Sequence, residues 1–208
     1  MLIGINGEKG SGKSAAGNHL VVAHDFKPVA FADLVKHVAK DLFPSLTHAQ
    51  CWGSLEDKER VDPAIGKAPR WIFQRVGTEV GREGDMGAFA QMGVPALSVR
   101  AALKFWGVTP GPTAWIDATL NGLGALDEED NYVITDVRFP NEAEAVRARG
   151  GKVIRIERPD FATGELEDHP SETQVKHCVY DVLVVNDKHL GHLYDQVSGA
   201  YASFRKNA

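Results

Sequence analysis

The sequence of 208 residues predicts an α/β fold with three layers, in which a parallel β-sheet lies between two layers of helices. Five short apolar runs are bounded by Gly, Pro, Asp or Asn, and most of them are rich in Val and Ile, as buried strands are. Because the runs are continuous rather than alternating, they indicate parallel strands covered on both faces. Segments with a helical spacing of apolar residues lie between the runs, and a glycine-rich stretch joins the first run to the first of these segments.

The predicted strands are the five apolar runs, which cover residues 2–5, 28–32, 132–136, 152–157 and 181–186. The predicted helices alternate with them and cover residues 13–24, 33–43, 68–82, 140–150 and 190–204. Pro69 lies in the first turn of one helix, where the fixed φ of proline is favourable. The helix that opens with Pro140 has acidic residues in its first turn and arginines in its last, as the helix dipole favours.

Two stretches of the single predicted domain, residues 1–208, do not follow this alternation. Residues 83–125 are rich in Gly and Pro, with helical patterns near residues 96–106 and 113–121, and they predict a helical insertion that caps a site or forms an interface. Residues 158–174 are polar and contain Gly and Pro, which predicts a mobile, lid-like loop.

The composition is that of an ordinary globular protein, with 43% apolar and 25% charged residues. The net charge of −5 disfavours a protein that coats DNA or RNA, whereas a small phosphorylated ligand needs only a local group of Lys and Arg. Cys51 and Cys178 have no metal-ligand spacing and predict free thiols in a reducing compartment. No apolar run approaches the roughly 20 residues that cross a bilayer, and the first residues do not resemble a signal peptide, so we expect a cytoplasmic protein.

The glycine-rich stretch, residues 7–14, reads GEKGSGKS and matches the phosphate-loop pattern G-x-x-x-x-G-K-[ST] in full. Its glycines let backbone N–H groups turn inward around phosphate oxygens, and the following helix directs its positive dipole end at the anion. In this motif the lysine reaches the β- and γ-phosphates and the serine binds Mg²⁺. The sequence therefore predicts a site for nucleotide phosphates formed by Gly10, Ser11, Gly12, Lys13 and Ser14. A chance glycine turn is the structural alternative, which the strand before and the helix after disfavour.

The rest of the chain narrows the class of phosphate-loop protein. A GTPase would carry Asn-Lys-x-Asp after a late strand, but that place holds Asn186-Asp187-Lys188, in the wrong order. A ring ATPase usually closes a strand with a second acidic pair, whereas YVITDVRF supplies only Asp136, followed by Arg138. We therefore favour a small-molecule kinase.

Asp136 ends an apolar strand and Arg138 follows it, so both are predicted to lie at the carboxyl edge of the sheet. There the carboxylate can reach Mg²⁺ or a water bound to it, and the guanidinium can lie close to phosphate. The structural alternatives are a cap or turn role for Asp136 and a surface ion pair between Arg138 and Glu142. Arg155 and Arg158 flank the start of the lid-like loop, from which guanidinium groups could reach a transferred phosphoryl group.

Two further segments offer candidates for the phosphate acceptor. FADLVK places Asp33 and Lys36 at the end of a strand and in the first turn of the next helix. Arg70, at a helix start, is suited to bind a monophosphate with two hydrogen bonds, and Gln74 follows one turn later on the same face. A helix cap at Asp33 and a solvated Lys36 remain the structural alternative.

The segments GEKGSGKS, FADLVK, PRWIFQRVGTEVGR, DVRFPNEAEAVRARGGKVIRIERP and HPSE together resemble the phage deoxynucleoside monophosphate kinase family, in the order of that family and over about half of the chain. The phosphate loop alone is unspecific, but the pair PR…Q…GTE and DVRFPNEAE…GG is selective. The resemblance implies a P-loop kinase fold with a five-stranded parallel sheet, an acceptor region and a lid. It also implies transfer of the γ-phosphoryl group of ATP to a deoxynucleoside monophosphate (dNMP), with Mg²⁺ as cofactor.

The resemblance also implies roles for individual residues. Lys13, Ser14 and the loop amides would hold ATP, and Ser14 and Asp136 would hold the metal. Lys13, Asp136, Arg138 and Arg158 would be catalytic. The acceptor would contact Asp33, Lys36, Arg70, Gln74 and Glu79, and the adenine would contact Asn186, Asp187 and Lys188.

One departure leaves base specificity open. Trp115 lies 33 residues beyond Arg82, so that residues 83–112 look like an insertion relative to the family. A P-loop kinase acting on modified bases in DNA remains an alternative, because residues 67–82 are locally basic, and so does a non-catalytic ATP-binding regulatory module. A kinase for another small acceptor is a weaker option, and a homodimer is left open.

Overall fold

The computed structural model describes residues 1–124, 130–159 and 173–206. The chain divides into two compact units. We call Met1–Ala30 with Ala125–Ala208 the sheet unit, and Phe31–Gly124 the helical unit. Each unit is described by itself below.

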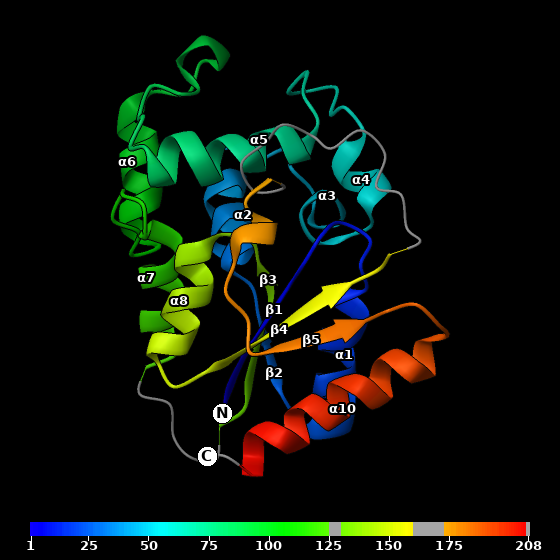
Figure 1. Ribbon diagram of the computed structural model, residues 1–208. Coiled ribbons are helices and arrows are strands. Elements are labelled where there is room, and N and C mark those ends of the chain that lie inside the picture. The colour runs from blue at the N-terminus through cyan, green and yellow to red at the C-terminus, as the bar shows by residue number, and fades with distance from the viewer. Residues whose placement is uncertain (125–129, 160–172, 207–208) are drawn as a thin grey trace. The chain divides into compact units, whose positions relative to one another are not determined.

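The sheet unit contains five parallel strands in the order β2-β3-β1-β4-β5, which confirms the predicted fold class (Figure 1). The strands are β1 (Leu2–Gly7), β2 (Lys27–Val29), β3 (Tyr132–Val137), β4 (Lys152–Glu157) and β5 (Val182–Val185). β1 is buried along its whole length, as its central place in the sheet requires. The second strand is shorter than its apolar run predicts, because the buried Phe31 already begins the following helix.

Helices cover both faces of this sheet, as predicted (Figure 1). They are α1 (Lys13–His24), α8 (Pro140–Ala148) and α10 (Leu190–Lys206), with a short 3₁₀ helix η3 (Val175–His177). Ile3 and Ile5 share a core with apolar residues of α1 and α10. Gly4 lies between them in β1 and faces Val146 of α8, because a Cβ at Gly4 would contact the Val146 side chain at 3.5 Å. Alternate residues of a strand point to opposite faces, so α8 forms the third layer.

The helical unit has its own core, built around Val38, Ile72, Val76, Phe89 and Trp115. Its helices are α2 (Phe31–Leu42), α3 (His48–Trp52), α4 (Leu55–Glu59), α5 (Pro69–Arg75), η1 (Val76–Arg82), η2 (Ala90–Met92), α6 (Ala96–Phe105) and α7 (Ala114–Gly122). α3 and α4 were not predicted, although each begins with a capping box, Thr47 with Gln50 and Ser54 with Asp57.

The predicted helix over residues 68–82 changes its form at Val76, where η1 continues α5 as a π-helix. Trp115 of α7 packs against this wider turn. The indole N–H of Trp115 donates to the carbonyl of Gly77 at 2.8 Å. A Cβ at Gly81 would lie only 2.4 Å from the indole ring. The π-helix therefore depends on glycine at a position where the tryptophan ring fills the space of a side chain.

None of the helices within the described residues is long and apolar enough to cross a membrane. Both cysteines are free, as the sequence predicts, and both are buried. Burial raises the pKa of the Cys178 thiol to about 12, with the charge of Glu142 as a smaller cause, so that this thiol stays protonated at neutral pH.

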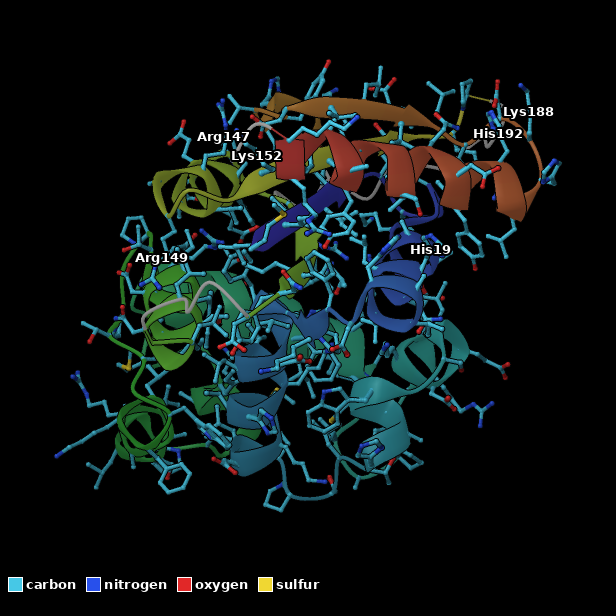
Figure 2. All side chains as sticks on the ribbon, turned by 90° about the horizontal axis from the view of Figure 1, so that it is seen from below. His19, Arg147, Arg149, Lys152, Lys188 and His192 are labelled. Carbon is cyan, nitrogen blue, oxygen red and sulfur yellow. The ribbon has the colours of Figure 1, made fainter. Side chains whose placement is uncertain are left out.

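Two histidines of α1 share one hydroxyl group of α10. Nε2 of His19 lies 2.8 Å and Nε2 of His24 lies 2.9 Å from Oγ of Ser198. The ring of His19 also stacks on Tyr194 of α10, with 4.4 Å between the centroids (Figure 2 shows His19 on α1). The hydroxyl oxygen can accept from both rings, or donate its proton to one ring and accept from the other, so Ser198 joins the two histidines to α10.

We predict that Gly81→Ala lowers the free energy of unfolding by about 1–3 kcal/mol, because the added methyl group overlaps the Trp115 ring. Urea denaturation followed by tryptophan fluorescence measures this change. Gly77→Ala, in the same π-helix, is the matched control, since its Cβ would lie 3.9 Å from Val35, an ordinary contact. Equal stability of the two variants would contradict this account of Gly81.

We also predict that the protein loses stability as the pH falls below about 6.5. Burial lowers the pKa of His19 below its ordinary value of 6.5, the charge of His24 lowers this pKa further, and Asp195 opposes both. Because the folded state has the lower pKa, it binds fewer protons than the unfolded chain, so the neutral ring stabilises the fold above pH 6.5 and this contribution is lost as the pH falls through the folded pKa.

The measurement is urea denaturation at pH 7 and pH 5 for the wild-type protein and for His19→Gln, whose amide can bond Ser198 but does not titrate. The variant is expected to lose less stability between the two pH values. An identical loss in both proteins would show that His19 makes no contribution.

Candidate functional site

The glycine-rich loop connects β1 to α1 and has the backbone form that phosphate binding needs. Gly10 and Gly12 have φ angles of 79° and 108°, a region that favours glycine. The Ser11 N–H donates to the carbonyl of Glu8 at 3.1 Å, which closes the loop into a tight ring. The Lys13 ammonium donates to the same carbonyl at 2.6 Å and so lies over the loop. Ser14 follows in the first turn of α1 and is exposed.

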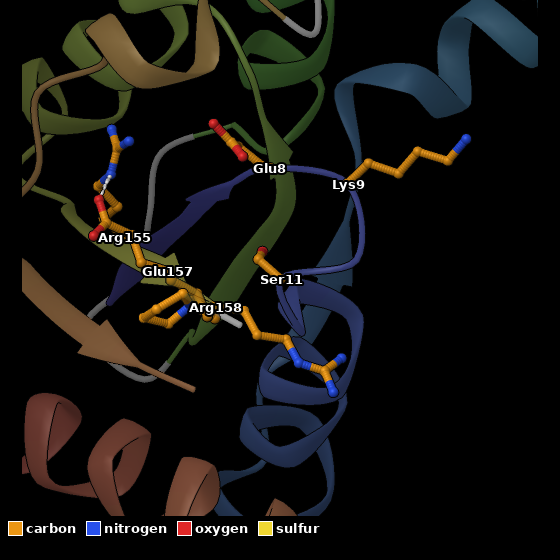
Figure 3. A pocket seen from close by; sticks show the side chains of 8 residues that line it. Glu8, Lys9, Ser11, Arg155, Glu157 and Arg158 are labelled. Atoms are coloured by element: carbon orange, nitrogen blue, oxygen red, sulfur yellow. Dashed lines mark hydrogen bonds and ion pairs between the residues drawn. The ribbon is translucent and has the colours of Figure 1, made fainter. Parts of the chain in front are cut away.

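A pocket of about 290 Å³ lies beside this loop, lined by the loop and by the carboxyl end of β4 (Figure 3). Its lining residues are Glu8, Lys9, Ser11, Arg155, Ile156, Glu157, Arg158 and Pro159. Ser11 is only 3% exposed, and its Oγ has no hydrogen-bond partner within residues 1–124, 130–159 and 173–206. A buried hydroxyl without a partner costs about 1–3 kcal/mol. The loop therefore fits an oxygen-rich anion such as a phosphate group, which would give the Ser11 hydroxyl an acceptor.

Asp136 and Arg138 come from the carboxyl end of β3, as predicted. The pairing of Val137 with Asn6 places this end of β3 beside the end of β1, just before the loop. Glu142 is 3% exposed, and its Oε2 accepts the backbone N–H groups of Arg138 at 2.8 Å and Phe139 at 3.1 Å. The Glu142 carboxylate thus caps α8 and fixes the backbone that carries Arg138.

Asn186, Asp187 and Lys188 follow β5, and the structure brings Asn186 to the loop itself. The Asn186 amide Nδ2–H donates to the carbonyl of Ser11 at 2.9 Å. Asp187 lies 3.7 Å from Nδ1 of His192, and Lys188 is exposed at the same end of α10 (Figure 2).

Arg155 and Arg158 differ in their surroundings. Arg158 is exposed at the end of β4, and most of the lid-like loop, residues 160–172, lies outside the described residues. Arg155 is 8% exposed, and its Nε–H donates to Glu157 at 2.8 Å while Nη1–H donates to the carbonyl of Lys176 at 3.2 Å. Its guanidinium therefore joins β4 to the segment around Lys176, a role that the sequence did not indicate.

The helical unit brings two of the predicted acceptor residues together with a tryptophan. Lys36 lies 2.9 Å from Asp33, whose Oδ1 also accepts the indole N–H of Trp52 at 3.0 Å. The Lys36 ammonium lies 5.8 Å from the centre of the Trp52 ring, within cation–π distance. Since α2 begins at Phe31, Asp33 lies in the first turn rather than at the cap position. The Lys36 side chain is 16% exposed, so it is not a solvated lysine.

Lys58 of α4 joins this group, and sequence reasoning missed it. Burial lowers the pKa of Lys58, the charge of Lys36 lowers this pKa further, and Asp33 and Asp57 oppose the change. The nearby charge of Lys36 thus makes charged Lys58 less favourable, and a bound anion would offset this cost. Nothing in the segment LEDKE distinguishes Lys58 from a surface lysine, because its burial comes from tertiary packing.

The remaining acceptor candidates lie on α5 and η1. Arg70 and Gln74 are half-buried on α5. Glu79 lies 3.5 Å from Arg75. The Arg75 guanidinium lies 5.0 Å from the centre of the Trp71 ring and donates to the carbonyl of Ala88 at 3.3 Å. Glu79 is thus engaged by a packed arginine, whereas Arg70 and Gln74 stand one turn apart.

Among solved structures, the chain is similar to a dephospho-CoA kinase from Campylobacter jejuni, with 15% identity and a TM-score of 0.40 over 98% of this chain and 96% of that one. A protein of Ictalurid herpesvirus 1, "Uncharacterized protein ORF77", is 38% identical over 69 residues, which cover 33% of this chain and 30% of that protein.

Two further comparisons bear on the family of the chain. The family model "Deoxynucleotide monophosphate kinase" matches residues 113–197. A protein of Acanthamoeba polyphaga mimivirus, described as "Putative deoxynucleotide monophosphate kinase", is 33% identical over 202 residues, which cover 95% of this chain and 94% of that protein. The segments that carried the resemblance in the sequence therefore identify the family correctly, and the chain belongs to the deoxynucleotide monophosphate kinase family.

Proposed function

We propose that the protein transfers the γ-phosphoryl group of ATP to a deoxynucleoside monophosphate, with Mg²⁺, to give ADP and a deoxynucleoside diphosphate. The observation that carries this proposal is the complete phosphate loop, with the buried hydroxyl of Ser11 beside its pocket, in a chain of this family. No strong general base is needed, because the acceptor phosphate is already ionised at neutral pH. Catalysis by positioning and charge neutralisation is sufficient.

The sheet unit supplies the donor side of the proposed reaction. Backbone N–H groups of residues 10 and 12–14 bind the phosphates, while the Ser11 N–H stays on the Glu8 carbonyl. The Lys13 ammonium exchanges that carbonyl for phosphate oxygens. Ser14 and Asp136 would hold Mg²⁺, which neutralises phosphate charge when it is bound. Arg138 and Arg158 stabilise the charge on the transferred group.

The helical unit supplies the acceptor side. Lys36 and Lys58 bind the monophosphate, and Asp33 orients Lys36 by the ion pair at 2.9 Å. Arg70 and Gln74 extend this contact from α5. Because a phosphate dianion offsets the repulsion between the two ammonium groups, its binding is favoured over that of an uncharged nucleoside.

The structure gives less support to a kinase acting on polymeric DNA. The locally basic stretch over residues 67–82 would have to contact the polymer backbone. Arg75 packs on Trp71 and pairs with Glu79, and Arg82 donates to the carbonyl of Pro112 at 2.9 Å. Two of these cations are therefore engaged within the helical unit.

We predict that Lys13→Ala lowers kcat for dNMP phosphorylation by about 10²–10³-fold, because one preorganised cation is lost from the transferring phosphates. The assay incubates the protein with ATP, Mg²⁺ and each of dAMP, dGMP, dCMP, dTMP and a hydroxymethylated pyrimidine monophosphate, and separates the products. The nucleotide that is converted identifies the accepted base.

The matched control is Lys104→Ala, an exposed lysine of α6, which should retain full activity. A DNA duplex serves as the alternative acceptor. No conversion of any monophosphate would refute the proposed function, with transfer to the duplex indicating a DNA kinase and ATP binding without transfer indicating a regulatory module.

We predict that Lys58→Ala raises the KM for the dNMP by about tenfold and leaves the KM for ATP within about twofold of wild type, since one charge-assisted contact is removed from the acceptor only. Initial rates at varied dNMP and varied ATP separate the two constants. Arg60→Ala, which removes only an exposed pair with Glu56, is the control. If Lys58→Ala changed the KM for ATP and not that for the dNMP, its assignment to the acceptor would be wrong.

A further inference from the structure

We propose that Asn186 is a positioning residue that locks the phosphate loop in its binding conformation, and that it does so by holding the Ser11 carbonyl rather than by contacting the adenine. The family resemblance had placed Asn186 in the adenine-contacting segment. The inference rests on the proposed function, because it assigns to the loop the phosphates of the donor nucleotide.

Asn186 joins three parts of the sheet unit. Its backbone N–H donates to the carbonyl of Glu157 at 2.7 Å, which continues the β4–β5 ladder by one residue. Its side-chain amide donates to the carbonyl of Ser11 at 2.9 Å. The loop is thereby attached to the carboxyl ends of two strands through one residue that is 175 positions away from Ser11 in the chain.

The direction of this hydrogen bond determines what the loop presents to a ligand. In a trans peptide the C=O and the following N–H lie in one plane and point in opposite directions. When the Ser11 carbonyl points to Asn186, the Gly12 N–H of the same peptide must point away from β5. Since Gly12 has a φ of 108° and few steric limits, this peptide could otherwise rotate. The Asn186 amide therefore fixes the orientation of one phosphate-binding N–H.

The packing around Gly12 shows that this contact is closely fitted. A Cβ on Gly12 would lie 2.7 Å from Nδ2 of Asn186 and 3.2 Å from Cδ2 of Leu193. Glycine at this position thus serves two needs, the positive φ and the approach of the Asn186 amide. Leu193 is 1% exposed, so the side of the loop that faces α10 rests on buried core.

Asn186 is itself held by α10. Gln196 accepts the backbone N–H of Val185 at 3.2 Å and donates to the carbonyl of Val185 at 2.8 Å. These two bonds fix the residue before Asn186 at the point where β5 ends. A continuous series of hydrogen bonds therefore runs from α10 through the end of β5 to the phosphate loop.

A positioning role and an adenine contact make different predictions. If Asn186 orients a phosphate-binding N–H, its loss weakens the binding of every ligand with a polyphosphate group, whatever its base. If it contacts adenine, its loss weakens the binding of ATP and leaves the binding of inorganic tripolyphosphate unchanged, because that ion has no base. The binding of tripolyphosphate is therefore the readout that a base contact would not change.

The experiment measures the Kd of ATP and of inorganic tripolyphosphate, each with Mg²⁺, by calorimetry for wild type and Asn186→Ala. We expect both Kd values to rise by a similar factor of about tenfold, as for loss of a hydrogen bond that orients a charged contact. Asn186→Asp should bind both ligands no more tightly than Asn186→Ala does, since it offers oxygen instead of N–H to the Ser11 carbonyl. Asn18→Ala, an exposed asparagine of α1, is the matched control and should bind as wild type does.

Two results would overturn the proposal. One is a higher Kd for ATP with an unchanged Kd for tripolyphosphate, and the other is no change in either Kd. If Asn186→Ala does not fold, as judged by circular dichroism, Gln196→Ala tests the same series of bonds and should weaken both ligands by a smaller, equal factor, with unchanged binding overturning the proposal. A wild-type protein that binds tripolyphosphate but phosphorylates no dNMP would refute the proposed function alone, because the binding comparison does not depend on turnover.

Discussion

The close packing of the phosphate loop against the ends of β4 and β5 is the constraint on which the rest of the sheet unit depends. A Cβ on Gly7 would lie 2.5 Å from the carbonyl of Ile156, just as one on Gly12 would overlap the Asn186 amide. Glycine at these two positions lets the loop backbone come close to Ile156 and Asn186. The same approach buries Ser11 and so creates the hydroxyl that a phosphate oxygen would satisfy.

Parallel strands bring the remaining residues proposed for the donor side to the same edge of the sheet. Asp136 lies near the end of β3, and Arg158 and Asn186 follow β4 and β5. All parallel strands end on one side, where ligands of open α/β sheets bind. The proposed acceptor group of the helical unit has another origin. It arises where α2, α3 and α4 place Lys36, Trp52 and Lys58 close to Asp33, so its chemistry depends on helix packing rather than on strand ends.

The parts of the structure that the sequence predicts are those that local patterns determine. Continuous apolar runs identified all five strands, and the loop motif identified the glycine-rich turn between β1 and α1. The π-helix could not be predicted, because it depends on a contact between Gly81 and Trp115. Lys58, the structural role of Arg155 and the contact of Asn186 with Ser11 were missed for the same reason, since burial and hydrogen bonding across the chain leave no periodic signal. The capping boxes of α3 and α4 were present in the sequence and could have been used.

The central claim is that one phosphoryl group passes from ATP to a deoxynucleoside monophosphate. ³¹P NMR of the wild-type protein with ATP, Mg²⁺ and the preferred dNMP follows donor and acceptor in one sample. We expect ADP and the deoxynucleoside diphosphate to appear in equal amounts, with no matching rise in inorganic phosphate. Release of inorganic phosphate while the dNMP remains unchanged would show that the loop supports hydrolysis instead, and would contradict the account.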